Sequence, residues 1–269
     1  MAMRLEDRAV IALSGPQARG FLQGLITNDI ERLAPGKALY AALLTPQGKI
    51  LFDFLIAEGD GAILLDCAAE SRDALLKRLK MYRLRAKLEI EARDQLVLLA
   101  GQPDPKAGIS FIDPRLAALG HRTIGARAEM PAAEDGAAQY RARRLDLGVP
   151  EGADFGQDRM FALDAGLDEL HAVSFDKGCY VGQELTARMK HRGTARKRLL
   201  PVQILDGTSL PQPDTPLKAN GRDIGEITTV YGARGFALVR LDRLEEAGDA
   251  AIEAGSVRVG VIKPSWLFA

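Results

Sequence analysis

The sequence has few of the residues that bind metals or cross-link chains. Its 269 residues include only two cysteines, Cys67 and Cys179, so we expect no disulfide framework. A resident iron–sulfur cluster normally takes four cysteine ligands, which this chain cannot supply. The histidines, His121, His171 and His191, are scattered, and without a CxxC or HExxH motif we expect no permanent zinc site. Cys179 can therefore act at most as one metal ligand among others that partners provide.

The chain also lacks long apolar runs and an excess of either charge. Lys plus Arg and Asp plus Glu both number 36, so the molecule has no overall attraction to nucleic acid. The first eight residues have no apolar core region, and no later apolar run is long enough to span a bilayer. We therefore expect a soluble, cytoplasmic protein without a membrane partner. No P-loop and no GxGxxG at a strand-to-helix turn are present, and aromatic residues make up only 6%, which disfavours sequence-specific reading of RNA.

The hydrophobic pattern indicates alternating strands and helices in the first 100 residues. A strand at 9–13 is followed by Ser-Gly-Pro and a helical pattern at 17–25. A strand at 96–100 again precedes Gly and Pro, which we interpret as a weak internal duplication. Two further strands are predicted at 38–44 and 49–56, joined by a Thr-Pro-Gln-Gly turn.

The rest of the chain predicts a helix, a long irregular stretch and a small β-domain. Leucines at helical spacing predict a helix over 70–82. Residues 101–138 are rich in Pro, Gly and Ala with little period, which indicates connecting structure. Prolines in 205–216 indicate a domain boundary. Strands at 224–231, 235–239 and 256–262 then predict a small β-barrel.

The run Lys177–Glu184 places a thiol beside a cation, between glycines and ahead of a predicted helix at 183–190. A thiol is a nucleophile or metal ligand only as the thiolate, which a nearby cation or helix N-terminus favours. Lys177 lies two residues before Cys179, so both features are suggested. A buried, inert cysteine is the alternative, and it is less in keeping with polar, glycine-rich neighbours. Cys67 ends an apolar stretch and is interpreted as packing.

Asp53 is a charge among apolar neighbours in a predicted strand. A carboxylate there is partly desolvated and needs a partner, which could be an amine or ring nitrogen of a ligand. An ordinary ion pair with an internal arginine is the alternative, and the sequence does not decide between them. Glu184 and Arg188 stand four residues apart, in the favourable order for a structural pair on one helix face.

Basic residues gather in three clusters. Their members are Lys77, Arg78, Lys80, Arg83, Arg85 and Lys87; Arg141, Arg143 and Arg144; and Arg188, Lys190, His191, Arg192, Arg196, Lys197 and Arg198. Charge runs of this kind are usually solvated faces. The third cluster adjoins the thiol and contains almost no acid, so it could hold a carboxylated or phosphorylated ligand, or RNA backbone.

Five segments together resemble the YgfZ-type folate-binding proteins, which are relatives of aminomethyltransferase, the glycine-cleavage T protein. They are Phe21–Asp29, Leu44–Ile50, Arg83–Lys87, Gly148–Gly152 and Lys177–Glu184, and the resemblance covers nearly the whole chain. The last segment is the most specific. Its Lys-Gly-Cys head is absent from the aminomethyltransferase pattern and points to the YgfZ-type branch.

The resemblance implies an α+β fold, with duplicated folate-binding lobes of the aminomethyltransferase type around a central hole and a small C-terminal β-barrel. It assigns residues 1–200 to the folate-binding region of two interleaved lobes and residues 201–269 to the barrel. By position, Asp53 matches the carboxylate that approaches the reacting nitrogen of folate. Tyr40 matches an aromatic residue of that pocket.

The resemblance also implies a set of site residues for tetrahydrofolate or a derivative of it. Arg141 or Arg144 is the candidate for the carboxylate tail of the folate. Lys177 and Glu184, on either side of the thiol, are further candidates for cofactor binding. Cys179 and Asp53 are the candidates for chemistry. Lipoyl-protein contacts of aminomethyltransferases have no recognisable counterpart, which argues against aminomethyl transfer itself.

Three functional hypotheses follow. The first is an accessory factor for the assembly or repair of iron–sulfur enzymes, especially [4Fe–4S] clients, including those that thiolate tRNA. In it, tetrahydrofolate lies near Asp53, and the Cys179 thiolate, exposed beside it, ligates or reduces a labile cluster intermediate. The second is a folate-dependent aminomethyl transferase assisted by Asp53. The third, a tRNA-binding module acting through residues 188–198, is not favoured.

Overall fold

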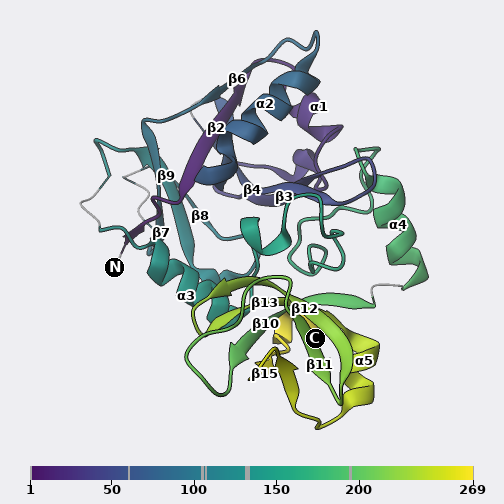
Figure 1. Ribbon diagram of the computed structural model, residues 1–269. Helices are drawn as coiled ribbons and strands as arrows, with labels where there is room; N and C mark the ends of the chain where they lie inside the picture. Colours follow the sequence, from purple (N-terminus) through teal and green to yellow (C-terminus); the bar gives the residue numbers. More distant parts are fainter. Residues whose placement is uncertain are drawn as a thin grey trace.

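The computed structural model describes residues 2–59, 61–103, 106, 108–130, 134–193 and 196–268. Two open β-sheets with their helices lie next to a closed β-barrel (Figure 1). This arrangement confirms the predicted α+β class and the C-terminal barrel. Among the described residues, no helix is both long and apolar enough to cross a membrane.

The first sheet has the strand order β3-β4-β5-β2-β6 and carries two helices on one face. Its elements are β2 (Arg8–Ser14), α1 (Ala18–Gln23), β3 (Leu39–Leu44), β4 (Ile50–Gly59), β5 (Ala62–Ala68), α2 (Arg72–Arg83) and β6 (Glu89–Ala92). Leu22 of α1 and Leu75 and Leu79 of α2 are buried with Phe54 of β4 in one apolar cluster. The strands and helices expected in this part of the chain are therefore confirmed.

The two faces of β4 belong to different cores. Phe54 and Ile56 pack on the side of α1 and α2, whereas Leu55 and Ala57 belong to the central cluster on the other side. Because successive side chains of a strand point to opposite faces, Asp53 shares the face of Leu55 and Ala57. The carboxyl therefore points away from the helices and toward the centre of the molecule.

The second sheet has the order β1-β7-β9-β8 and is followed by α3. Its elements are β1 (Met3–Arg4), β7 (Leu96–Gly101), β8 (Ile109–Ile112), β9 (His121–Ala126) and α3 (Ala137–Leu147). The expectation of mostly irregular structure over 101–138 is thus wrong in part. The two strands have only 4 and 6 residues, so neither shows a clear hydrophobic period.

The C-terminal barrel closes in the order β10-β13-β12-β11-β14-β15. Its elements are β10 (Lys197–Ile204), β11 (Pro216–Ala219), β12 (Arg222–Tyr231), β13 (Arg234–Arg240), α5 (Leu241–Ala247), β14 (Ile252–Ala254) and β15 (Val257–Val261). The proline-rich segment 205–216 connects β10 to β11, the first two strands of the barrel in chain order. It is therefore a loop within the barrel domain and does not mark a domain boundary. The division of the chain after residue 200 stays a prediction.

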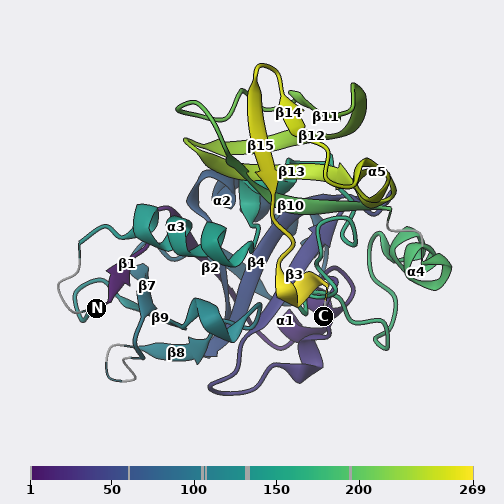
Figure 2. The same cartoon turned by 90° about the horizontal axis from the view of Figure 1, so that it is seen from below.

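The chain between α3 and α4 (Gln183–Arg192) fills the space among the three β-structures (Figure 2). Phe155, Leu163 and Leu167 from this segment are buried in one cluster with Leu55 of the first sheet and Phe236 of the barrel. The segment begins with the 3₁₀ turn η4 (Gly152–Phe155). Other 3₁₀ turns are η1 (Ile30–Arg32), η2 (Ala69–Ser71), η3 (Ala117–Leu119) and η5 (Ser265–Leu267). The site residues described next belong to this shared interior.

Candidate functional site

Two adjoining cavities lie where the first sheet, α3 and the barrel meet. Their volumes are about 380 Å³ and about 420 Å³. Asp53 lines the first, and Arg141 and Arg144 line the second. The lining residues common to both are Ala68, Glu70, Gly152 and Ala153. Each volume falls within the roughly 300–1,000 Å³ of small-molecule sites, and together they form one elongated depression.

Asp53 is 6% exposed and is held by uncharged donors. The hydroxyl of Tyr40 on β3 donates to its Oδ2 at 3.0 Å, and the backbone N–H of Gly152 donates to its Oδ1 at 2.9 Å. Burial raises the pKa of the Asp53 carboxyl, and the nearby charge of Arg8 only partly opposes this. The direct partners are thus a hydroxyl and a backbone amide, rather than the arginine that the sequence left open.

Next to the cavities lies a buried cluster of charges that sequence analysis did not identify. Its members are Arg8, Asp66, Asp113, Arg115, Arg122, Arg144, Glu151 and Asp154. Nε of Arg8 donates to Oδ1 of Asp66 at 2.6 Å, and a terminal nitrogen of Arg115 donates to Oε2 of Glu151 at 2.6 Å. The only sequence signal was a lone charge inside an apolar strand, as at Asp66.

The charges of this cluster balance, which sets Asp53 apart. Four guanidinium groups face four carboxylates, as buried charges require. Although burial opposes it, Arg144, Arg115 and Arg8 hold the pKa of Glu151 well below its usual range. Asp53 is a fifth carboxyl with no arginine of its own and a raised pKa. Asp53 is therefore a buried carboxyl at the cavity wall that is suited to exchange a proton with a ligand.

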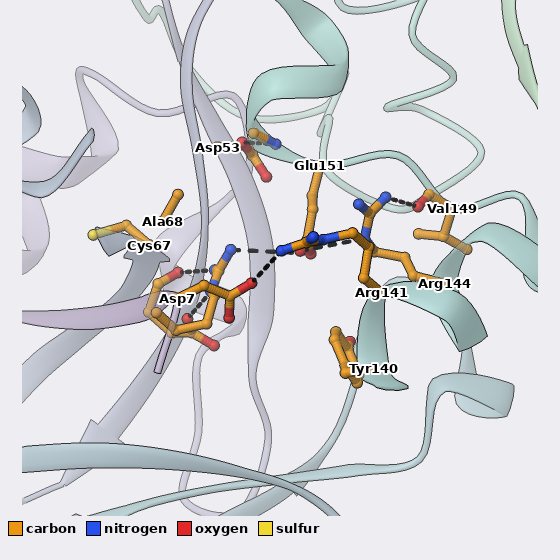
Figure 3. Close-up of polar contacts among 12 residues, drawn as sticks. Asp7, Asp53, Cys67, Ala68, Tyr140, Arg141, Arg144, Val149 and Glu151 are labelled. Atoms are coloured by element: carbon orange, nitrogen blue, oxygen red, sulfur yellow. Dashed lines mark hydrogen bonds and ion pairs between the residues drawn. The ribbon is translucent and has the colours of Figure 1, made fainter. Parts of the chain in front are cut away.

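The two candidate arginines of α3 differ in their free donors (Figure 3). Arg144 has a 3% exposed side chain and donates to Val149 O at 2.6 Å and to Asp154 Oδ2 at 2.7 Å, and its Nε lies 3.3 Å from Oε1 of Glu151. Arg141 has a 40% exposed side chain, contacts Asp7 at 3.5 Å and lies over the Tyr231 ring. Because most of its N–H donors remain available, Arg141 is the better placed of the two to bind a carboxylate.

Lys177 faces backbone carbonyls rather than the thiol. Its ammonium donates to the carbonyl oxygens of Gln23, Ile26 and Asn28 at 2.7, 2.7 and 2.8 Å. The residue is buried, and burial lowers the pKa of its amine to about 8. Lys177 lines neither cavity. It therefore fixes the loop that carries Cys179 onto the chain after α1, and the interpretation of Lys177 as the cation that activates Cys179 is not supported.

Cys179 is exposed, whereas Cys67 is buried, as its interpretation as packing required. The Cys179 loop ends at Gly182, which has φ +84° and lies so close to the β3–β4 turn that an added Cβ would be 2.5 Å from Thr45 O. The Cα of Gly48 in that turn would be 3.2 Å away. The Cys179 loop is thus held against the β3–β4 turn, two residues before Ile50, which lines the Asp53 cavity.

Cys179 is not among the lining residues of either cavity, and its expected place at the rim of the Asp53 pocket stays a prediction. Glu184 also lines neither cavity: its side chain is 85% exposed and pairs with Arg188 at 2.6 Å. Of the predicted site residues, the fold brings Tyr40, Asp53, Arg141 and Arg144 together and leaves the residues of the thiol segment elsewhere.

The third basic cluster is partly neutralised by acids. Lys190 pairs with Asp168 at 3.0 Å, and Arg198 pairs with Glu169 at 3.0 Å. The side chain of Arg192 lies outside the described residues. Because several of its charges already have carboxylate partners, the cluster offers less to RNA than its sequence indicated.

Comparisons with known proteins place the chain in a family. Residues 196–269 match the CAF17 C-terminal beta-barrel domain. The human mitochondrial iron–sulfur cluster assembly factor IBA57 is 33% identical, over 98% of this chain and 84% of that protein. The chain belongs to the IBA57 family. The mitochondrial IBA57 homologue of Coccidioides immitis is 30% identical, over 98% of this chain and 82% of the homologue.

A solved structure supports the fold in the same way. The aminomethyltransferase T of the glycine cleavage system from Bartonella henselae superposes with a TM-score of 0.76 at 18% identity, over 98% of this chain and 85% of that one. This likeness confirms the aminomethyltransferase type of fold that the resemblance implied. The assignment to the YgfZ-type branch stays a prediction beside the IBA57 family.

One prediction is overturned by these relatives. The IBA57 proteins of human, mouse and Coccidioides immitis are named as mitochondrial, so the expected cytoplasmic location is wrong. A lack of long apolar segments indicates that a protein lies in water rather than in a membrane. It does not distinguish one aqueous compartment from another.

Proposed function

We propose that the protein assists the assembly or repair of iron–sulfur enzymes, with the thiol of Cys179 accepting and passing on a cluster as cargo. The observation that carries this proposal is a single exposed cysteine on a fixed loop, in a chain of the IBA57 family. Its clients are [4Fe–4S] enzymes, including those that thiolate tRNA.

The ligand count explains why such a thiol suits transfer rather than storage. A cluster takes about four thiolate ligands, and Cys179 supplies one, so donor and client must supply the rest. A cluster held by one ligand from this chain can leave again. Water reaches the exposed thiol and can take up the proton that is lost when sulfur binds iron.

The adjoining cavities fit tetrahydrofolate, the ligand that we propose for them. The cavity at Asp53 offers a protonatable carboxyl for the nitrogens of a pteridine ring, and the other offers Arg141 for a carboxylate tail. Bound folate would supply one-carbon or reducing chemistry. Asp53 would orient the ring and exchange a proton with it.

Replacing Cys179 tests the leading proposal. In cells that depend on this protein, Cys179→Ser should lower the activity of [4Fe–4S] enzymes at least about tenfold, because a hydroxyl does not replace a thiolate as an iron ligand. Cys67→Ala is the matched control, since it removes the other, buried thiol and should keep most of the activity. Full activity with Cys179→Ser, at equal protein levels, would overturn the proposal.

A folate-dependent aminomethyl transferase is the second candidate, favoured by the raised pKa of Asp53 beside a cavity. It predicts turnover by the purified protein. With tetrahydrofolate and an aminomethyl donor, methylenetetrahydrofolate should form and should depend on Asp53. Absence of product while folate is demonstrably bound would dismiss this candidate.

A further inference from the structure

A surface groove lies between the start of α1 and the turn after α2, at the end of the molecule away from the barrel (Figure 1). Its volume is about 400 Å³. One wall is formed by Pro16, Gln17, Gly20 and Phe21, and the other by the turn 82–86. The floor is partly apolar, and the groove takes no part in the folate site or in holding the Cys179 loop.

Leu84 on the rim of this groove has a conformation and an exposure that the fold does not explain. Its φ is 47° and its ψ is −109°, and the N–H of Ala86 donates to Arg83 O at 2.8 Å. These values match the first central residue of a type II′ turn, a position that favours glycine. The side chain is also 84% exposed. Glycine would relieve the backbone strain and remove the exposed apolar surface, so folding alone gives no reason for a leucine.

The surroundings of Leu84 are strongly basic. Residues 77–87 contain six Lys and Arg and no Asp or Glu, although the chain as a whole has equal numbers of both charges. Within the described part of the chain, none of these six basic side chains forms an ion pair. Met81, 57% exposed, adds a second apolar side chain. The complementary surface is an apolar hollow rimmed by carboxylates, since an apolar anchor inside a charged rim is typical of protein interfaces.

The groove and the anchor of the Cys179 loop lie at opposite ends of the short helix α1. Lys177, two residues before Cys179, binds the carbonyl of Gln23 at the C-terminal end of α1, and the groove is formed by residues at its N-terminal end. An α-helix of 6 residues is about 9 Å long. A protein seated in the groove would therefore reach the Cys179 loop at the same time.

We propose that this groove, with Leu84 as its anchor, is the docking site for an acidic iron–sulfur protein that exchanges a cluster with Cys179. The inference rests on the proposed function, because it names the partner of that same thiol. Apolar contact at Leu84 gives affinity, and the basic residues around it speed the encounter and select acidic partners.

Leu84→Gly tests the anchor. The purified variant should melt within about 2 °C of the wild type or above it, since the fold loses strain and little buried surface. In cells, its [4Fe–4S] enzyme activity should fall about tenfold, as expected for loss of an interface anchor, while Leu84→Met should retain most of it. Leu205→Ala, which removes a 61% exposed leucine outside the basic segment, is the matched control and should change neither quantity. Unchanged enzyme activity with Leu84→Gly would overturn the anchor.

Photo-crosslinking tests the docking site without relying on cluster activity. A photoreactive amino acid at position 84 of the full chain should trap an iron–sulfur protein of net negative charge, several-fold more than the same group at position 205. The yield should fall at least about threefold in 300 mM salt, and likewise with Arg83→Glu and Arg85→Glu. Equal yields at both positions would overturn the docking site. If Cys179→Ser abolishes enzyme activity but Leu84→Gly does not, the proposed function of the thiol is supported and the docking site is overturned. If position 84 still crosslinks an acidic protein in a salt-sensitive way while Cys179→Ser is fully active, the docking site is supported and the role of the thiol is overturned.

Discussion

Asp53→Asn should separate ligand binding from folding. Asparagine has nearly the same shape as aspartate, and its Oδ1 accepts from the N–H of Gly152 as the carboxyl does. Its amide group can donate to the hydroxyl oxygen of Tyr40, but the Tyr40 O–H, which donates to Asp53 in the wild type, then loses its acceptor. One unpaired buried O–H costs about 1–3 kcal/mol at every pH. The substitution also removes the ability to carry a charge and to exchange a proton at the cavity.

The sign of the effect on stability follows from the raised pKa of Asp53. Its ordinary value is 3.8, and burial raises the pKa in the folded state. Stability from this group is fully present below pH 3.8 and is lost as pH rises through the folded value, at about 1.4 kcal/mol per unit of difference. The asparagine variant avoids this loss. Relative to the wild type, the variant should therefore be more stable at pH 7 than at acidic pH, and the difference should shrink toward pH 3.8.

The effect on binding has the opposite sign. A hydrogen bond between a carboxylate and a folate nitrogen contributes about 1.5–3 kcal/mol, so its loss weakens tetrahydrofolate binding about 10- to 150-fold. Anaerobic calorimetric titration at pH 7 measures the effect on binding, and melting curves from about pH 3.5 to pH 8, a range that spans the ordinary pKa of 3.8, measure the effect on stability. Asp66→Asn is the contrasting control: Asp66 is fully buried and pairs with Arg8 and Arg122, so that variant should lose about 3–5 kcal/mol of stability. Equal folate affinity of wild type and Asp53→Asn would refute the reasoning.

Three further variants test the rest of the site. Arg141→Ala should weaken tetrahydrofolate binding about tenfold but change the free energy of unfolding by under about 1 kcal/mol, because its ion pair is exposed; unchanged affinity would contradict the assignment. Lys177→Met should lose about 3–5 kcal/mol in a chemical melt, since three carbonyls lose their donor, and a stable variant would contradict this account of the loop. Gly182→Ala should lower the free energy of unfolding by over about 2 kcal/mol and alter the rate of Cys179 alkylation, because its Cβ would meet Thr45. Gly193 has φ +58° and open space around it, so Gly193→Ala is the control and should cost only about 1 kcal/mol. Equal costs would show that the contact with Thr45 is unimportant.

The elements with a clear hydrophobic period were predictable from sequence, and the short ones were not. β2, α1, β3, β4 and α2 carry enough apolar residues for a period of two or 3.6 to show. The strands β8 and β9 were not predicted, because they have only 4 and 6 residues, too few to show a hydrophobic period. Their strand character comes from the pairing of β9 with β7 and of β8 with β9, tertiary contacts that local sequence does not contain.

Of the candidate site, too, only the part that depends on local sequence could be predicted. Asp53 could be identified because a carboxylate inside an apolar strand needs a partner wherever the strand packs. The identity of that partner could not, since Gly152 lies 99 positions away and donates from its backbone. The contacts of Lys177 could not be predicted for a related reason: closeness to Cys179 in sequence indicated an activating cation, whereas its amine donates to carbonyls more than 140 positions earlier.

The β3–β4 pair connects the proposed folate cavity to the loop that carries the thiol. Tyr40 and Asp53 lie in the middle of this pair, and Thr45 and Gly48 lie at its turn, against Gly182 of the Cys179 loop. From Gly48 to Asp53 the extended chain covers about 16 Å, and Ile50 between them lines the cavity. The same two strands therefore contact both places, and a change in them on folate binding would reach the Cys179 loop through Thr45 and Gly48.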